Sequence, residues 1–392
     1  MNFVFNIGLF GIVLYMSMDV ILIGDENVAR PEVQLVAGVS LIVMIFYNAY
    51  YLFTRYRITY EWSFIRIWLL FIALMFIYYL MAYLELPTRL AQTRSREVVI
   101  ALFGLSGLFF IYHGTLVGHL TQRKLDFLLL AIIANGLIEI YHALSTVRIK
   151  DDIGIINTSA GYVFLMIMPI LMYKFKNDMI WVFFATLILT VLTGKRGALL
   201  IYGLLLVYSL VNIKMLAELI ALNYKTLIFA LITIIIAIFA VDNAMESLKY
   251  RFFNIVDERT GEIGSGRDTI WSSLFMYWWD GDVLKIFIGS GYNSAAGYIG
   301  QIAHNDFVSF LFEFGLLGLL IYLIMLNNFR KTVNRISIEA PYLGYLLTMC
   351  LIILVGRGLI SGTIRTDNIN LSITIGYLMA MFMLTRGFNV KN

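Results

Sequence analysis

The sequence predicts an all-α polytopic membrane protein that crosses the bilayer about twelve times. Hydrophobic residues make up 60% of the chain and charged residues only 14%, whereas soluble domains average about 45–50% and about 25%. The mean hydropathy is +0.84. Apolar runs of roughly 18–22 residues, long enough to span a hydrocarbon core, recur from end to end. These runs are too long for the strands of a membrane barrel, so helices must form the spans.

Each apolar run is interpreted as one helix, and residues 1–392 as a single transmembrane domain. The first run has no basic leader and no small-residue cleavage site, which favours a membrane helix over a removed signal. The runs at 125–142 and 178–193 are short, which favours tilted or partly re-entrant helices. The expected helices cover 2–23, 33–53, 63–84, 98–118, 125–142, 155–173, 178–193, 197–213, 225–241, 304–326, 342–361 and 368–385.

The basic residues of the short loops set the expected orientation. With the N-terminus in the cytoplasm, every cytoplasmic loop carries at least two basic residues, and most acidic residues fall in the opposite loops. An even number of helices then places both termini in the cytoplasm. The longest polar stretch, residues 242–303, becomes one large extracytoplasmic loop.

The loop at 242–303 carries the first candidate site residues. A short amphipathic helix is expected at about 267–279, and on it Arg267 and Trp271 lie at i and i+4, hence on one face. A guanidinium group beside an exposed indole suits a phosphorylated sugar. The alternative is a helix lying on the outer leaflet, with its tryptophans as interfacial anchors.

His304 stands where this loop meets the next apolar helix, at the lipid–water boundary of the outer face. The unperturbed pKa of histidine lies near the working pH, so its imidazole can accept a proton from a hydroxyl group. The alternative is a helix-start residue that forms a hydrogen bond with a loop carbonyl.

Two further arginines fall at or below the outer surface. Arg196 occupies a tight turn between two apolar helices, and Arg357 lies inside an apolar run. An arginine within the membrane is costly, which favours a functional site, and snorkelling toward the interface is the alternative. We expect Arg196 and Arg267 to converge on one cavity, with Arg357 as a third member.

A polar stripe toward the outer end of the helix at 125–142 supplies the last candidates. Asn135, Glu139 and His142 fall at i, i+4 and i+7. Glu139 and His142 join Trp271 as candidates for contacts with a sugar in the same cavity. The alternative is that the stripe holds neighbouring helices together.

Metal and cofactor sites are not expected. Cys350 is the only cysteine, so the chain has no cysteine-based metal site and no internal disulfide. Asp280 and Asp282 have the spacing of an acidic metal-binding pair, but Asp-Gly-Asp is also an ordinary turn. The run from Gly289 to Gly291 lacks the third glycine of a dinucleotide-binding loop and follows no βαβ pattern.

Four motifs follow one another in the second half of the chain. They are Thr-Gly-Lys-Arg196-Gly-Ala-Leu-Leu, Arg267-Asp-Thr-Ile-Trp271, Ile-Phe-Ile-Gly289-Ser-Gly291 and His304-Asn305-Asp-Phe-Val-Ser-Phe-Leu-Phe-Glu313-Phe-Gly315-Leu-Leu-Gly318. Their order and spacing resemble the O-antigen polymerase and O-antigen ligase superfamily of bacterial membrane glycosyltransferases. The first half of the chain matches this superfamily only in being helical.

The resemblance implies a metal-independent, inverting glycosyltransferase of GT-C-type architecture in the bacterial inner membrane. It implies that Arg196 and Arg267 bind the diphosphate of an undecaprenyl-diphosphate-linked donor and that His304 assists the acceptor hydroxyl. Two arginines can stabilise the growing charge of a diphosphate leaving group without a metal ion. The expected partners are the lipid-linked donor and acceptor, the bilayer and a chain-length regulator protein, with no cofactor and no nucleic acid.

Three functions remain open on the sequence alone. The favoured one is an O-antigen, capsular or exopolysaccharide polymerase that joins lipid-linked repeat units at the outer face. The second is a ligase that passes the finished glycan to lipid A core or to a protein. The third is a transporter or flippase for lipid-linked glycan, which a base at the membrane edge disfavours.

Overall fold

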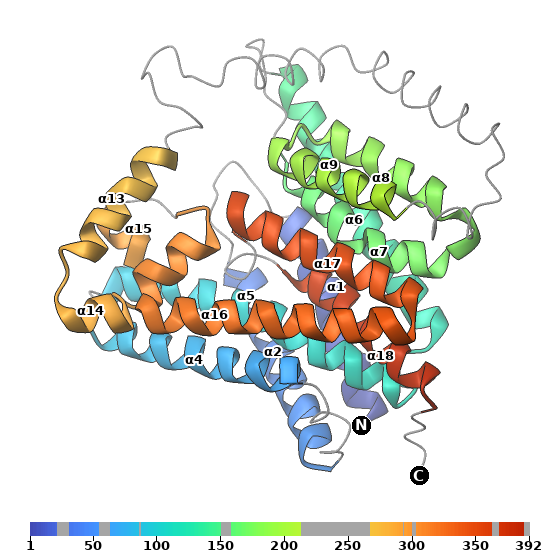
Figure 1. The fold of residues 1–392 in the computed structure, drawn as a ribbon, viewed down its shortest axis with the longest axis horizontal. Helices are drawn as coiled ribbons and strands as arrows, with labels where there is room; N and C mark the ends of the chain where they lie inside the picture. Colours follow the sequence, from blue (N-terminus) through green and yellow to red (C-terminus); the bar gives the residue numbers. More distant parts are fainter. Residues whose placement is uncertain are drawn as a thin grey trace.

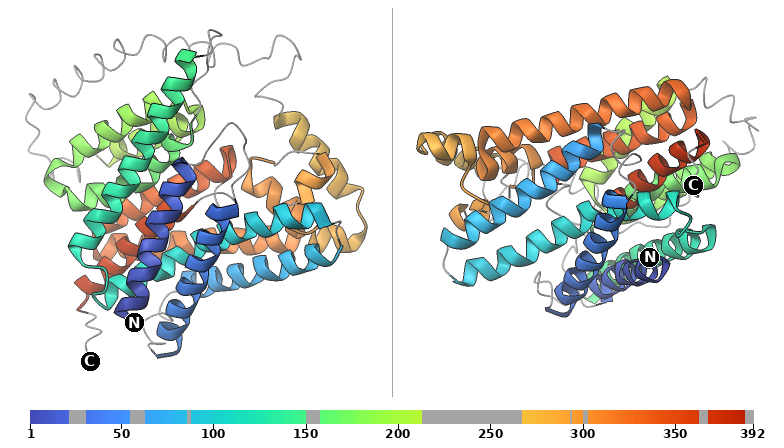
Figure 2. Two further views of the ribbon diagram at one scale, coloured as in Figure 1. Left: turned by 180° about the vertical axis from the view of Figure 1, so that it is seen from behind. Right: turned by 90° about the horizontal axis from the view of Figure 1, so that it is seen from below.

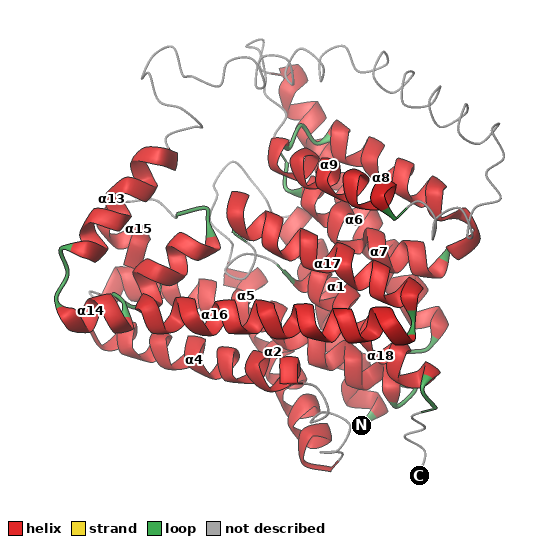
Figure 3. Cartoon of the chain, in the orientation of Figure 1, coloured by secondary structure: helices red, strands yellow, loops and turns green. Residues whose placement is uncertain are grey.

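The computed structural model describes residues 1–21, 31–54, 63–85, 88–149, 158–212, 267–292, 294–299, 303–362 and 368–387. Across these ranges every regular element is a helix, and none of them contains a strand (Figure 3). The helices of the first half are α1 (Asn2–Ile21), α2 (Pro31–Thr54), α4 (Ser63–Glu85), α5 (Thr88–Leu116), α6 (Gln122–Ile149), α7 (Ala160–Lys174), α8 (Met179–Leu192) and α9 (Arg196–Val211). Those of the second half are α13 (Arg267–Trp279), α14 (Val283–Ile288), α15 (Ser294–Ile299), α16 (Asp306–Glu339), α17 (Pro341–Ile360) and α18 (Ile369–Thr385).

The all-α class is confirmed for the described residues, and their apolar helices support a membrane protein. By length and hydropathy, five of the described helices can cross a membrane, or up to six if the bent pair α7–α8 counts as one span. Each expected membrane helix overlaps one of these elements, except the helix at 225–241, which lies outside the described residues. The total of about twelve spans stays a prediction.

Helices α5 and α18 form the centre of the bundle. Almost every residue of α18 is buried, as expected for a helix that is apolar on all sides and surrounded by other helices. Glycines bring the two backbones close, since a Cβ on Gly376 would lie 2.4 Å from the Leu108 carbonyl oxygen. Small residues at helix contacts are the usual route to tight packing in membranes.

One end of the bundle holds both termini (Figures 1 and 2). Lys124, at the start of α6, donates a 2.7 Å hydrogen bond to Asn6 of α1. Arg386, just after α18, forms a 3.0 Å ion pair with Glu339 at the end of α16. We call this the terminal end, and α13, α14 and α15 lie at the opposite end (Figures 1 and 2).

Helices α7 and α8 form a hairpin. Their axes differ by 119° across the turn at 175–178, so the chain reverses direction there. At the turn, Lys174 pairs with Asp126 of α6, which places the turn at the terminal end. At the other end of the hairpin, the Thr158 amide donates a 3.4 Å hydrogen bond to the Thr193 carbonyl.

Helix α16 is broken at Gly315, whose φ of 64° and ψ of −168° are not helical. A Cβ on Gly315 would lie 2.5 Å from the Phe287 carbonyl group, and one on Gly289 would lie 2.4 Å from the Glu313 carbonyl group. Both glycines are therefore required for α14 to meet the break backbone to backbone.

The break leaves carbonyl groups of α16 that need partners from outside the helix. Three are satisfied by other segments. Ser290 N–H donates to the Phe312 carbonyl at 3.0 Å and Gly291 N–H to the Glu313 carbonyl at 2.9 Å. The Tyr78 hydroxyl of α4 donates to the Phe314 carbonyl at 3.2 Å. The Gly-Ser-Gly run thus supplies two of these three hydrogen bonds to α16.

Candidate functional site

The C-terminal end of α17 is the meeting point of the candidate arginines. Arg357 lies one turn before this end and is only 6% exposed. Its guanidinium carbon lies 4.9 Å from the centroid of the Tyr162 ring on α7. Its Nη1 lies 3.0 Å from the Met166 sulfur, one turn further along α7. The side chain is therefore held inside the bundle against α7.

Arg267, the first residue of α13, reaches the same helix end. Its Nη1 donates a 2.5 Å hydrogen bond to the Ile360 carbonyl. The last carbonyls of a helix have no partner within the helix, so a donor from another segment is favourable there. The contact attaches α13 to α17 and uses one of the five N–H donors of a guanidinium group.

Arg196 opens α9 beside the other two arginines. A Cβ on the next residue, Gly197, would lie 2.2 Å from the Tyr162 hydroxyl oxygen and 2.7 Å from the Ile360 side chain. Burial and, to a lesser degree, the positive charge of Arg267 lower the pKa of the Arg196 guanidinium. The structure thus brings Arg267 and Arg357 to the end of α17 and places the start of α9, which carries Arg196, against Tyr162 and Ile360. Binding of a phosphate group by these arginines stays a prediction.

His304 is the only non-glycine residue with a positive φ in the described part of the chain, at 51°. This left-handed conformation is uncommon for residues other than glycine, although histidine, asparagine and aspartate adopt it more often than the rest. Such strain persists where the surroundings impose it, and it concentrates at functional sites. The side chain of His304 is half-buried, so part of it is accessible.

The residues on either side of His304 are anchored. The Trp271 indole donates a 2.7 Å hydrogen bond to the Ala303 carbonyl. The Asn305 amide donates a 3.0 Å hydrogen bond to the Leu359 carbonyl, and its Oδ1 accepts from Val308 N–H at 3.2 Å. Asn305 is therefore the N-cap of α16. His304 is held against the same end of α17 that Arg267 contacts.

Trp271 accordingly has a structural contact in addition to any contact with a ligand. The indole N–H is the only polar group of the side chain, and the Ala303 carbonyl occupies it. Helix α13 packs through the buried Leu274 and Trp278 against Phe312 of α16. The predicted contact between the Trp271 ring and a sugar stays a prediction.

The side chain of Glu139, on α6, contacts the start of α7. It accepts hydrogen bonds from the Thr158 hydroxyl, from the Ser159 hydroxyl at 2.8 Å and from the Ala160 N–H at 3.1 Å. These are the contacts of a carboxylate that caps a helix N-terminus. They support the interpretation that the polar stripe joins helices, with Glu139 fixing the turn of α7 that carries Tyr162.

The other two members of the stripe face different surroundings. Asn135 is buried and donates a 3.3 Å hydrogen bond to the Ser17 hydroxyl of α1. His142 is exposed and its ring packs edge-on against Tyr141 at 6.0 Å. The predicted contact of His142 with a sugar stays a prediction.

Two residues that the sequence did not single out belong to this place. Tyr162 lies beneath Arg357, and Asp306 is fully buried in the first turn of α16. A Cβ on Gly358 would lie 3.1 Å from the Asp306 carboxylate, so this carboxylate packs on the end of α17. The tyrosine lies within an apolar run and gives no sequence signal, whereas Asp306 follows an N-cap and reads as an ordinary helix start.

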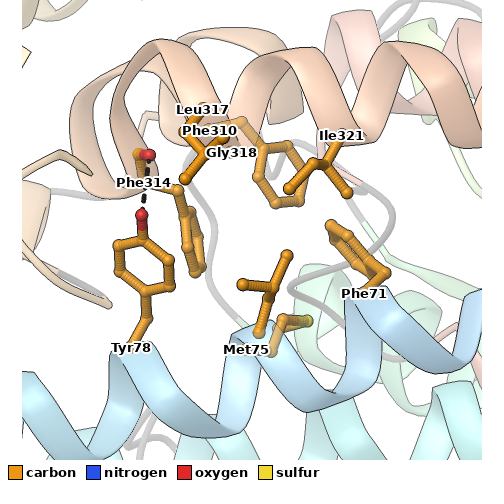
Figure 4. A pocket seen from close by; sticks show the side chains of 9 residues that line it. Phe71, Met75, Tyr78, Phe310, Phe314, Leu317, Gly318 and Ile321 are labelled. Atoms are coloured by element: carbon orange, nitrogen blue, oxygen red, sulfur yellow. Dashed lines mark hydrogen bonds between the residues drawn. The ribbon is translucent and has the colours of Figure 1, made fainter. Parts of the chain in front are cut away.

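A small pocket lies elsewhere, between α4 and α16 (Figure 4). Apolar and aromatic side chains line it together with one glycine, and no charged residue is among them. The lining residues are Phe71, Leu74, Met75, Tyr78, Phe310, Phe314, Leu317, Gly318 and Ile321. Such a lining offers nothing to a phosphate group, so this pocket is not the candidate site.

The described residues include no group of three or more histidine, cysteine, aspartate or glutamate side chains placed to hold a metal ion. No protein-family model matches the sequence, and no curated protein matches it significantly. The function is therefore inferred from the residues and their arrangement.

Proposed function

We propose that the chain is a membrane glycosyltransferase that joins oligosaccharide repeat units carried on undecaprenyl diphosphate, as an O-antigen, capsular or exopolysaccharide polymerase. One observation carries the proposal. Arg267 and Arg357 lie at the end of α17, and Arg196 opens the helix that packs against this end. His304, with its positive φ, is anchored to the same end through Asn305. A group of cations beside a potential base suits transfer from a diphosphate leaving group.

The proposed reaction is an in-line displacement at the anomeric carbon of the donor. The acceptor hydroxyl attacks this carbon from the face opposite the diphosphate and gives its proton to the imidazole of His304. The bond between the anomeric carbon and the diphosphate oxygen breaks, and its electron pair leaves with the oxygen. The guanidinium groups stabilise the charge on that oxygen, which is why the proposed reaction uses no metal ion. The anomeric centre is inverted.

The arrangement of the helices supports a site on the outer face of the inner membrane. The helix end that carries Arg357 and Ile360 contacts α13 through Arg267, and α13 lies opposite the terminal end (Figures 1 and 2). With the termini in the cytoplasm, as the basic loops predict, the arginines face outward. About twelve spans in a GT-C-type architecture are part of this proposal.

Replacement of His304 by asparagine or glycine tests the proposal. Both residues adopt a positive φ more readily than most others, and neither can accept the proton. We expect the variant proteins to accumulate normally and polymer formation to fall ~10²–10⁴-fold. Extraction of lipid-linked glycans should then recover the carrier loaded with a single repeat unit.

The same extraction separates the alternatives. Loss of a ligase would leave long polymer on the lipid carrier, and loss of a transporter would leave single units on the cytoplasmic leaflet. Normal polymer in both variants would contradict the proposed role of His304, which would then be a residue that only starts a helix.

A further inference from the structure

Tyr162 is the aromatic residue at the centre of the cations. It lies in the first turn of α7 and is only 2% exposed. The guanidinium carbon of Arg357 lies 4.9 Å from its ring centroid and the Lys195 ammonium nitrogen lies 5.9 Å from it. Both distances fall within the range of about 6 Å for cation–π attraction.

Gly197 makes this arrangement possible. A Cβ at that position would lie 2.2 Å from the Tyr162 hydroxyl oxygen, which is closer than two such atoms can approach. The absence of a side chain at Gly197 lets the hydroxyl end of the ring fit against the start of α9. The Lys195-Arg196-Gly197 turn therefore supplies Lys195, which contacts the ring, and the space that the hydroxyl end of the ring occupies.

Cations gathered in a low-dielectric interior repel one another, so some other group must hold them together. An aromatic ring attracts cations through its quadrupole. The buried Tyr162 ring contacts two of these cations, Arg357 and Lys195, and so can hold them together.

We propose that Tyr162 is the positioning residue of the anion site, and that its ring holds Lys195 and Arg357 so that they act together with Arg196 and Arg267 on both phosphates of a polyprenyl diphosphate. The inference rests on the proposed function for the identity of the ligand. It adds Lys195 to the three arginines as a fourth cation of the anion site. It also assigns the positioning of the cations to the Tyr162 ring and not to its hydroxyl group.

Three variants of the full-length protein, purified in detergent, test the inference. Tyr162→Phe keeps the ring and removes the hydroxyl, whereas Tyr162→Leu removes both. Tyr173→Leu is the matched control, because Tyr173 lies on the same helix and packs against Tyr342 and Tyr377 without contacting an arginine in the described part. Binding of inorganic diphosphate and of inorganic phosphate is measured together with the unfolding temperature and, for the lipid-linked donor, kcat and KM.

We expect Tyr162→Leu to weaken diphosphate binding at least about tenfold, since two cation–π contacts are lost. The same variant should raise the donor KM by a similar factor and change kcat little. Tyr162→Phe should bind diphosphate within about threefold of the unsubstituted protein, because phenylalanine retains the π face. Tyr173→Leu should lower the unfolding temperature without changing diphosphate binding.

Unchanged diphosphate binding in Tyr162→Leu would overturn the inference and leave the proposed polymerase intact, since the His304 variants test that function separately. An equal loss in Tyr162→Phe would assign the effect to the hydroxyl and overturn the role of the ring. An equal loss in Tyr173→Leu would show that any damage to α7 has this result. No binding of diphosphate by the unsubstituted protein would overturn both the inference and the arginine site.

Discussion

Arg267 combines a structural contact with a predicted contact to a ligand, and the two can be separated at the level of one side chain. Its hydrogen bond to the Ile360 carbonyl needs a single donor, which lysine also supplies. The bidentate grip on a phosphate needs the planar fork of a guanidinium group. Replacement by lysine therefore removes the bidentate contact with a phosphate and preserves the hydrogen bond to the Ile360 carbonyl.

We predict that Arg267→Lys accumulates and unfolds like the unsubstituted protein while polymer formation falls at least about tenfold. Polymer length and amount in cells, beside the unfolding temperature of the purified protein, provide the measurement. Arg335→Lys is the control, since Arg335 is exposed and its 3.3 Å ion pair with Glu339 lies at the terminal end. Full activity of Arg267→Lys would leave Arg267 with the structural contact alone.

The sequence indicates the arginines and His304 more readily than it indicates their surroundings. Arg357 attracts attention because a charge inside an apolar run is costly. Tyr162 does not, because a tyrosine in an apolar run looks the same whether it contacts a cation or another ring, as Tyr173 does. Only the folded chain distinguishes the two.

At the level of elements, the contact between α14 and α16 depends on two glycines that meet across a break. Gly315 has a positive φ, and a Cβ there would lie 2.5 Å from the backbone of Phe287. No change of rotamer relieves a clash with backbone, so α14 would have to move. Such a movement would disturb Ser290 and Gly291, whose N–H groups bond to carbonyls of α16.

We predict that Gly315→Ala destabilises the protein by about 1–3 kcal/mol or more, through strain at a left-handed residue and loss of these hydrogen bonds. Thermal unfolding in detergent measures the effect. Gly203→Ala is the control, because Gly203 lies within α9 with nothing near a built Cβ, and alanine there should be neutral or stabilising by up to about 1 kcal/mol. Equal stability of the two variants would contradict the proposed close contact.

The lengths of the elements show what periodicity can and cannot predict. The short helix at 267–279 was expected and α13 covers Arg267–Trp279. In contrast, α16 continues to Glu339, well beyond the expected end at 326. The extension carries charged residues that resemble a loop, yet its Phe329, Val333 and Ile336 are buried at helical spacing. A count of continuous apolar runs misses the part of a helix that is apolar on one face only, as the extension of α16 is.

At the scale of the whole molecule, composition was enough to predict the class but not the assembly of the site. Arg196, Arg267 and Arg357 come from three helices, and their meeting depends on how α7, α9, α13 and α17 pack. Nothing in the spacing of these residues encodes that packing. By contrast, the basic residues of the short loops predict which loops share one face of the membrane. Lys124 and Arg386, from two of these loops, both contact other helices at the terminal end.

The hairpin of α7 and α8 provides the most demanding test of the topology. At 1.5 Å per residue, its helices of 15 and 14 residues extend only about 22 Å, less than the ~30 Å of a typical hydrocarbon core. Even so, the turn at 175–178 contacts the start of α6 through Lys174 and Asp126, and Lys176 lies 5.1 Å from the Tyr342 ring at the start of α17. We therefore predict that the turn reaches the cytoplasm across a locally thinned bilayer.

Cysteines introduced one at a time and labelled with an impermeant maleimide test this prediction. The background is low because Cys350 is the only cysteine and is buried. The unsubstituted protein should therefore react little. Asp280→Cys, Lys331→Cys and Asn177→Cys each introduce an exposed thiol, and all three should react once the membrane is dissolved in detergent. With the outer face alone accessible, only Asp280→Cys should react. Reaction of Asn177→Cys from outside would show that the hairpin is a re-entrant loop. Equal reaction of Asp280→Cys and Lys331→Cys would contradict the predicted orientation and, with it, an outward-facing arginine site.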